Sequence, residues 1–245
     1  MLKRFLNRLR TRRRNACFCT LAIHPPYRRR ARLLLTDVPG VNWIVLTDEP
    51  NDFADLPVRA IRHAPTGPMA IDVQHRPEQG HIDGEPAYHD KRFVLQAALA
   101  EFDTAIFCDA DSRLRSLPRL PHFPPGIAVD CAFSETIAEH LSRFGPMRKP
   151  ALEQLALELM GETDVLNSAR WCSEALFAVT RDGNESRFLE AWERGANFLQ
   201  DKGIFSGEGG VIGLAAAYAG WTVDYQSLRK LVAATEHEAG GPKVS

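Results

Sequence analysis

The segment from Thr104 to Ser112 constrains the fold more than any other part of this chain. It consists of the apolar run Thr-Ala-Ile-Phe-Cys followed by Asp-Ala-Asp-Ser, which holds Asp109 and Asp111. The β-branched and aromatic residues predict a buried strand, and the amphipathic residues 90–101 predict a helix before it. In an open α/β sheet, acids at the carboxyl end of such a strand lie where ligands bind, and a divalent cation would offset their mutual repulsion. The alternative is that the two acids cap a turn ahead of Pro118.

Elsewhere the sequence alternates between strand-like and helix-like patterns, which favours an α/β fold with a mainly parallel sheet flanked by helices. The 245 residues are enough for one large domain. The predicted strands cover residues 17–23, 43–47, 127–133 and 175–180, and the predicted helices cover residues 27–35, 151–160, 185–200 and 211–218. Residues 63–90 are rich in proline, glycine and histidine, which indicates a long loop through which substrate would enter.

The composition is that of an ordinary globular protein, with 44% hydrophobic and 25% charged residues. The net charge of −1 conceals a basic start, because residues 1–36 hold 11 Lys or Arg and no acid. The remainder therefore has 19 basic and 31 acidic residues. This excess of negative charge argues against a nucleic-acid partner.

Cysteine usage argues against zinc and against a disulfide framework. The five cysteines are odd in number and have no Cys-x-x-Cys spacing, and most lie in apolar runs. We therefore expect small buried hydrophobic side chains in a reducing compartment, the cytoplasm. These residues are Cys17, Cys19, Cys108, Cys131 and Cys172.

Residues 1–14 form a basic amphipathic pattern, in which Leu2, Phe5, Leu6 and Leu9 recur at helical spacing among seven Lys and Arg side chains. Such a segment either lies on an anionic membrane surface, as a peripheral attachment to its inner face, or is a solvated tail. Its lack of acids also resembles an organellar transit peptide, but serine is absent. No apolar run reaches the roughly 18 residues of a membrane-spanning helix, and no signal peptide is evident.

Three segments resemble the GT-A fold nucleotide-sugar glycosyltransferases, in particular the retaining glycogenin-like and blood-group-type families. Residues 91–111 resemble the helix-to-strand block that carries the metal-binding Asp-x-Asp. Val45-Leu-Thr-Asp-Glu-Pro50 resembles the second-strand block of the blood-group type. Residues 237–243, His-Glu-Ala-Gly-Gly-Pro-Lys, fit the His-x-x-Gly-x-x-Lys pattern of the glycogenin-like group.

The resemblance implies a GT-A domain over residues 16–234, with a basic segment at residues 1–15 before it and a tail at residues 235–245 that closes over the donor. The implied activity is metal-dependent transfer of a sugar from a nucleoside diphosphate sugar, a uridine diphosphate (UDP) sugar first of all, to a carbohydrate or glycolipid acceptor with retention of configuration. A diphosphate leaving group needs its developing charge stabilised, and Mn²⁺ or Mg²⁺ bound by carboxylate oxygens does this well.

The same resemblance implies a set of site residues. The metal ligands are Asp109, Asp111 and His237, and the donor-binding residues are Tyr27, Asp48, Lys91, Arg92, Asp109 and Lys243. Tyr27 would stack on the nucleobase, or it is a packing residue. Lys91 and Arg92 would place positive charge on the diphosphate or the sugar, or they belong to a solvated helix face. His237 and Lys243 otherwise lie in a polar tail that frays.

Glu208 is the implied catalytic residue. The stretch Ser206-Gly-Glu-Gly-Gly-Val-Ile-Gly213 resembles the acidic block that opens the last helix in both families. Glu208 would then stabilise positive charge at the sugar carbon, act as the nucleophile or bind an acceptor hydroxyl. Otherwise it is an acid at the positive end of a helix dipole. Trp171 and Trp192 either stack on sugars or belong to the core.

Two alternative functions compete with this interpretation. Haloacid-dehalogenase-class phosphatases also carry Asp-x-Asp after a strand. That class has the pair after its first strand and a later Gly-Asp-x-x-x-Asp loop, which this sequence lacks. The non-enzymatic alternative is a sugar- or metal-binding relative of transferases, recruited to membranes by residues 1–14.

Overall fold

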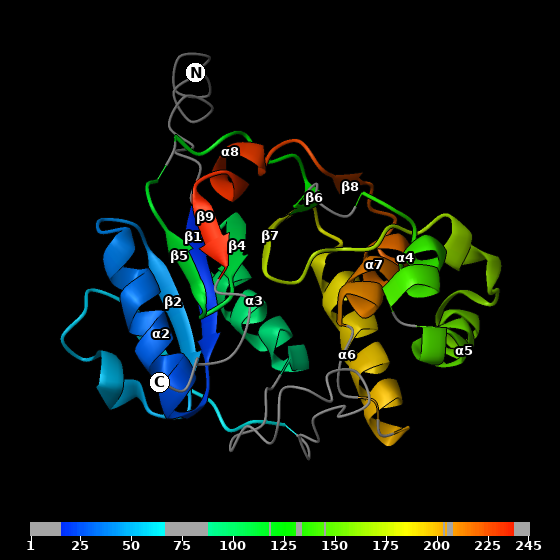
Figure 1. Cartoon of the computed structure of the whole chain (residues 1–245), viewed down its shortest axis with the longest axis horizontal. Helices are drawn as coiled ribbons and strands as arrows, with labels where there is room; N and C mark the ends of the chain where they lie inside the picture. The colour runs from blue at the N-terminus through cyan, green and yellow to red at the C-terminus, as the bar shows by residue number, and fades with distance from the viewer. Residues whose placement is uncertain are drawn as a thin grey trace, which may run out of the picture.

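The computed structural model describes residues 16–66, 88–117, 119–130, 134–144, 146–202, 204 and 208–237 (Figure 1). In these residues the chain forms a seven-stranded sheet in the order β3-β2-β1-β4-β7-β6-β8 and a two-stranded sheet of β5 and β9. The strands are β1 (Ala16–Ala22), β2 (Trp43–Thr47), β3 (Arg59–Arg62), β4 (Thr104–Cys108), β5 (Ser112–Leu114), β6 (Gly126–Val129), β7 (Leu176–Thr180), β8 (Val223–Asp224) and β9 (Thr235–His237). The α-helices are α2 (His24–Asp37), α3 (Lys91–Leu99), α4 (Ile137–Phe144), α5 (Lys149–Met160), α6 (Glu185–Asp201), α7 (Glu208–Tyr218) and α8 (Arg229–Val232). Short 3₁₀ helices are η1 (Pro50–Phe53), η3 (Tyr88–Asp90), η5 (Pro146–Arg148) and η6 (Asp164–Asn167).

The strand directions confirm the predicted α/β class with a mainly parallel sheet. Strands β3, β2, β1 and β4 are parallel, whereas β7 runs antiparallel between β4 and β6. After β1 the chain builds β2 and β3 on one side and then returns to form β4 on the other side. The strand order thus reverses between β1 and β4, and ligands of open α/β sheets bind outside the carboxyl ends of the strands at such a switch point.

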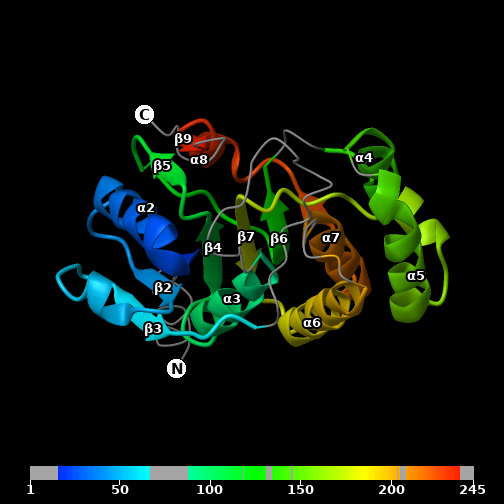
Figure 2. The same cartoon turned by 60° about the horizontal axis from the view of Figure 1, so that its bottom comes forward.

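Helices cover both faces of the large sheet, with α3 and α6 on one face and α2 and α8 on the other (Figure 2). Cys19 and Phe107 face the first core, which also holds Trp192 of α6. Their neighbours Phe18 and Ile106 face the second core, beneath α2 and α8. Because the central strands are buried on both faces, they read in the sequence as continuous apolar runs.

Most predicted elements lie within one to three residues of the observed ones, and β2 has the predicted bounds. Helix α2 begins three residues earlier than predicted, because its first turn accommodates Pro25 and Pro26. The N–H groups of a first turn make no hydrogen bond within the helix, so proline, which lacks an N–H, costs none there. Strand β6 ends at Val129, and residues 131–133 of the predicted strand lie outside the described residues. The sequence patterns missed β3, which is a four-residue strand with arginine at both ends, and the three-residue strands β5 and β9.

The predicted burial of the cysteines is confirmed for the four that the structure describes, which are free and buried: Cys17, Cys19, Cys108 and Cys172. In the described part of the chain, no helix is long and apolar enough to cross a membrane. The basic segment 1–15, residues 67–87 of the predicted loop, and residues 238–245, which include Lys243, lie outside the described residues. Of the predicted tail, residues 235–237 form β9.

Candidate active site

Four chain segments meet at the carboxyl edge of β4, at the switch point of the sheet. Asp109 directly follows β4, and Lys91 is the first residue of α3. Because β7 is antiparallel to β4, the residues that lead into β7 come to the same edge, where the N–H of Asp109 donates to the carbonyl of Ala175 at 2.8 Å. The fourth segment is the first turn of α7, which begins with Glu208.

Lys91 is the centre of a buried charge cluster. Its Nζ lies 3.0 Å from Asp109 Oδ1 and 2.9 Å from Glu208 Oε1. It also donates to the main-chain oxygen of Glu174 at 3.0 Å. The side chains of Lys91 and Glu208 are 5% and 3% exposed, and that of Asp109 is 22% exposed. The solvated helix face considered for Lys91 therefore does not hold, because its ammonium group is buried among acids.

The cluster sets the ionisation of its members. Burial lowers the pKa of Lys91, but the carboxylates of Asp109 and Glu208 more than offset this, so the pKa is raised and the ammonium stays charged. Burial raises the pKa of Glu208, yet the attraction of Lys91 prevails, so the pKa is lowered and the carboxylate stays ionised. For Asp109, burial outweighs Lys91 and repulsion by Asp111 adds to it, which raises the pKa to about 6.

Glu174 is a member of the site that the sequence patterns did not reveal. Burial, together with the negative charge of Glu208, raises the pKa of Glu174 to about 8, which favours the protonated carboxyl. Its only signal in the sequence is an acid shortly before the apolar run of β7. The antiparallel direction of β7 puts the residues before this strand at the ligand edge, and a short apolar run does not encode its own direction.

Close packing around glycines positions Glu208. A Cβ atom at Gly209 would lie 2.5 Å from the carbonyl oxygen of Cys172, and one at Gly213 would overlap the carbonyl oxygen of Arg170. Helix α7 therefore lies directly against the segment that leads into β7. This contact places Glu208 next to Lys91. The close packing also explains why the start of the helix is rich in glycine.

The second acid of the pair, Asp111, faces α2. Arg30 Nη1 lies 3.8 Å from Asp111 Oδ2, and the two side chains are 21% and 20% exposed. Tyr27, about one turn earlier in α2, is partly buried. Burial raises the pKa of its hydroxyl, and the negative charge of Asp111 adds to the effect. Tyr27 thus lies within electrostatic reach of the acid pair, and it also packs against the core beneath α2, as the packing alternative expects. Its contact with a nucleobase stays a prediction.

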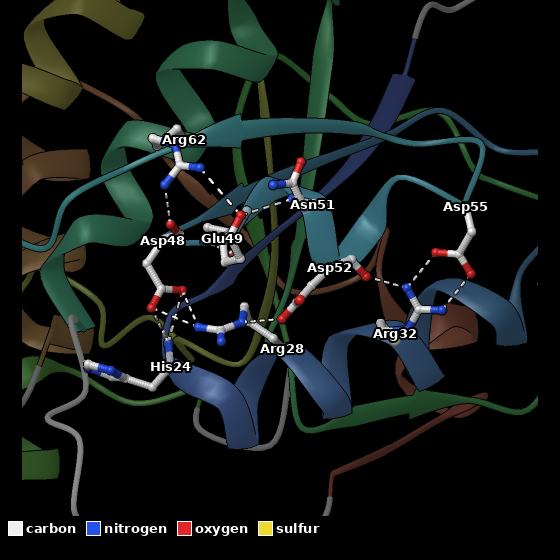
Figure 3. A network of polar contacts seen from close by, with 10 residues as sticks. His24, Arg28, Arg32, Asp48, Glu49, Asn51, Asp52, Asp55 and Arg62 are labelled. Carbon is white, nitrogen blue, oxygen red and sulfur yellow. Dashed lines mark hydrogen bonds and ion pairs between the residues drawn. The ribbon is translucent and has the colours of Figure 1, made fainter.

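Asp48 follows β2 at the same edge and fixes the start of α2 (Figure 3). Arg28 Nη1 donates to its two carboxylate oxygens at 2.7 and 2.8 Å, and the N–H of His24 lies 3.2 Å from each. Burial raises the pKa of Asp48, but the bonds from Arg28 and His24 outweigh it, so the pKa lies below its usual value. Arg28 Nε also donates to Asp52 at 2.6 Å. The structure thus shows a positioning role for Asp48, and donor binding by it stays a prediction.

Two imidazole rings near this edge have buried Nε2 atoms with no hydrogen-bond partner among the described residues, those of His24 and His89. His24 has a φ of 70°, a left-handed conformation that is uncommon outside glycine. Burial lowers the pKa of His89 to about 4, so its ring is neutral, and its Nδ1 accepts from the Trp192 indole at 3.3 Å. Unpaired buried polar atoms and backbone strain both occur preferentially at ligand sites.

Arg92 contacts residues at the start of α3. Its Nη1 donates to the main-chain oxygen of His89 at 2.8 Å and lies 3.7 Å from Asp90 Oδ1. The guanidinium group lies 4.1 Å from the centre of the Phe93 ring. Arg92 is buried, which excludes a solvated helix face, but the structure does not bring it to Asp109. Its role in donor binding stays a prediction.

Strand β9 brings the start of the tail to the acid pair. It pairs with β5 in antiparallel register, so that the backbone of His237 lies opposite Ser112, the residue after Asp111. β5 is itself anchored to α2, because Arg113 donates twice to Asp37, at 2.7 and 2.6 Å. The backbone position agrees with the metal role predicted for His237, whose side chain lies outside the described structure.

The two candidate sugar-stacking tryptophans belong to the core. Trp171 and Trp192 are 3% and 0% exposed. The ring of Trp171 stacks on His140 with the ring centres 3.6 Å apart, and Trp192 packs edge-on against Phe188. The core alternative is therefore confirmed for both.

The carboxylates present fit a hard divalent cation whose remaining coordination positions are filled by a bound ligand and water. Mn²⁺ and Mg²⁺ are commonly held by one or two carboxylates together with water and substrate phosphates, and Asp109 and Asp111 supply such oxygens. Within the described residues, no group of three or more His, Cys, Asp or Glu is arranged to hold a metal ion. His237 as a third protein ligand stays a prediction.

Comparison with models of protein families finds no matching family, and comparison with curated proteins finds no matching relative.

Proposed function

We propose that the protein is a GT-A fold glycosyltransferase that moves a sugar from a nucleoside diphosphate sugar to a carbohydrate or glycolipid acceptor, with retention of configuration and with Mn²⁺ or Mg²⁺. A UDP sugar is the expected donor. The observation that carries the proposal is the position of Asp109 and Asp111, which follow β4 at the switch point of the sheet, each beside a cation of the protein. Open α/β sheets bind ligands at that point.

A nucleoside diphosphate with its cation suits the charges at this edge. A divalent cation held by Asp109 and Asp111 would neutralise the charge that develops on the departing diphosphate. On the α2 side, Arg30 offers a planar guanidinium group to phosphate oxygens, and Tyr27 offers an aromatic ring to the base. The unpaired Nε2 atoms of His24 and His89 add polar groups that a ligand would satisfy.

The burial of Glu208 favours one of its three expected roles. A carboxylate nucleophile needs an open path to the sugar carbon, whereas Glu208 is 3% exposed and is bonded to Lys91. We therefore assign it the stabilisation of positive charge at that carbon, as an anion that Lys91 keeps ionised. In the transfer, the carbon–oxygen bond to the diphosphate breaks and its electron pair leaves with the diphosphate. The acceptor hydroxyl forms the new bond on the same face and passes its proton to the leaving oxygen.

The order of the elements argues against the phosphatase alternative, because the acid pair follows β4, the fourth of the strands in the part of the chain that the structure describes. Peripheral attachment to an anionic membrane through residues 1–14 would suit a glycolipid acceptor. Co-sedimentation with anionic vesicles, compared between the full chain and a variant lacking these residues at low and high salt, tests that part of the proposal.

Thermal unfolding in the presence of nucleotides tests the assigned function. A ligand that binds only the folded state raises the melting temperature, so we expect a UDP-dependent shift that needs Mn²⁺. Slow hydrolysis of the matching UDP sugar should accompany it. Asp111→Asn should remove both effects, whereas Asp201→Asn, at an exposed position at the end of α6, should remove neither. The absence of any nucleotide-induced shift and of hydrolysis would refute the proposal, and a shift without hydrolysis would indicate a non-catalytic relative.

A further inference from the structure

Both acids of the pair already face a cation of the protein, but the two cations differ in how firmly they are held. Lys91, opposite Asp109, is buried and is also bonded to Glu208. Arg30, opposite Asp111, is 21% exposed and lies on the surface of α2 at a longer distance of 3.8 Å. Lys91 is therefore fixed by its surroundings, whereas Arg30 has a long side chain with room to change partners.

A divalent cation that arrives alone meets an acid pair whose charge is already offset. To use both carboxylates it must displace Arg30 from Asp111, and it then lies close to the positive charges of both Arg30 and Lys91. A diphosphate changes this balance, because a guanidinium group binds phosphate oxygens through two parallel hydrogen bonds. The move of Arg30 to the diphosphate would take its positive charge away from Asp111 and make that carboxylate a better ligand for the cation.

We propose that Arg30 couples the binding of the divalent cation to the binding of the diphosphate. It neutralises Asp111 while the donor is absent, and it transfers to the diphosphate when the donor binds, which releases Asp111 as a metal ligand. The inference rests on the proposed function, since it takes a cation and a nucleoside diphosphate to meet at this acid pair. Coupling of this kind is reciprocal, so the cation raises the affinity for the nucleotide by the same factor.

Direct measurement of free Mn²⁺ by electron paramagnetic resonance tests the coupling without any turnover. With the full chain and UDP as the probe, saturating UDP should tighten Mn²⁺ binding about tenfold or more. Arg30→Gln should bind Mn²⁺ alone roughly fivefold more tightly, the upper end for a pair that is open to solvent. The gain from UDP should shrink in this variant, because glutamine carries no charge for the diphosphate.

Arg29→Gln is the matched control, since Arg29 is the exposed neighbour on α2 and its loss changes the net charge by the same amount. It should leave both Mn²⁺ affinities near those of the parent. Arg30→Lys keeps the charge without the planar fork, so it should restore weak binding of Mn²⁺ alone but only part of the gain from UDP. Unchanged melting temperatures would show that the variants are folded.

The failure of the coupling and the failure of the proposed function give different results. If Arg30→Gln changes Mn²⁺ affinity no more than Arg29→Gln does, or keeps the full gain from UDP, the coupling through Arg30 is refuted and the function stands. Independent binding of Mn²⁺ and UDP would refute the coupling and also the metal dependence of the proposed function. If neither UDP nor another nucleoside diphosphate binds to the parent chain with Mn²⁺, the proposed function itself fails.

Discussion

Lys91 and Glu208 form a buried ion pair of 2.9 Å between residues 117 positions apart in the chain. Removing one partner of such a pair is costly, because the remaining charge stays buried without compensation. The pair therefore joins α3 to α7 and holds the charges of the candidate site in place.

Lys91→Met should destabilise the protein by about 3 kcal/mol or more, because Asp109 and Glu208 then repel each other without a counter-ion. Urea unfolding followed by circular dichroism measures the change. The double variant Lys91→Met, Glu208→Gln should lose less than the two single changes together. Lys149→Met, at an exposed position, should be nearly neutral. A loss below about 1 kcal/mol for Lys91→Met, the scale of an exposed pair, would contradict the role assigned to it.

Glu174 should make the stability of the unliganded protein fall as the pH rises. The pKa of its carboxyl is raised from the ordinary value of 4.5 to about 8 in the folded state, chiefly by burial. Between these values the folded state binds more protons than the unfolded state, so the stabilisation from this group is complete below pH 4.5 and is lost as the pH rises toward and through 8. Glu174→Gln, which stays neutral, should raise the melting temperature at pH 8 and leave it nearly unchanged at pH 4.5.

The control for this titration is Glu162→Gln, at an exposed position after α5, which should follow the parent at every pH. If Glu174→Gln and the parent show the same dependence of melting temperature on pH, Glu174 is not protonated in the folded protein.

Gly213→Ala should prevent α7 from reaching its place, because the added methyl group overlaps the main-chain oxygen of Arg170. Overpacking against backbone costs about 1–3 kcal/mol or more. Gly210→Ala is the graded comparison, since its methyl group would meet the flexible end of Leu152 at 2.9 Å. Chemical denaturation should rank Gly213→Ala as the more destabilised of the two. The reverse order would show that α7 tolerates a shift away from the segment before β7.

Two truncations separate the roles of the tail. A chain that ends at Ala234 loses β9 and its pairing with β5, so the melting temperature of the unliganded protein should fall. A chain that ends at His237 keeps β9 and should melt like the parent. If Lys243 binds the diphosphate, both truncated chains should lose most of the UDP-induced thermal shift. A full shift in the chain ending at His237 would exclude the tail beyond β9 from donor binding.

The sequence predicted those features that local patterns encode. The apolar run before Asp109 and the helix that starts at Lys91 were both predicted correctly, because a strand buried on both faces and an amphipathic helix have distinct periodicities. The contact between Lys91 and Glu208 could not be predicted in this way. It depends on how closely the backbone of α7 approaches the segment before β7. A glycine-rich stretch indicates close packing but does not indicate which segment it packs against.

Glu174 and Arg30 were missed for a different reason. Glu174 reaches the site only because β7 is antiparallel, and the direction of a strand is set by the whole sheet. Arg30 is one of three consecutive arginines, and a run of charge usually indicates a solvated helix face. Only the observed position of α2 beside the acid pair singles out this arginine.

The groups that hold Lys91 are far apart in the sequence, and this separation determines when the site can form during synthesis. The ammonium group is held by groups at positions 109, 174 and 208, and an isolated buried charge is far too costly to persist. The entropic cost of closing such long loops must be met before the contacts contribute any stabilisation. Contacts of this kind therefore form slowly. A nascent chain that has already produced the acid pair therefore cannot complete the site before α7 emerges from the ribosome. The candidate active site would then mature as a single event, once α7 has been made.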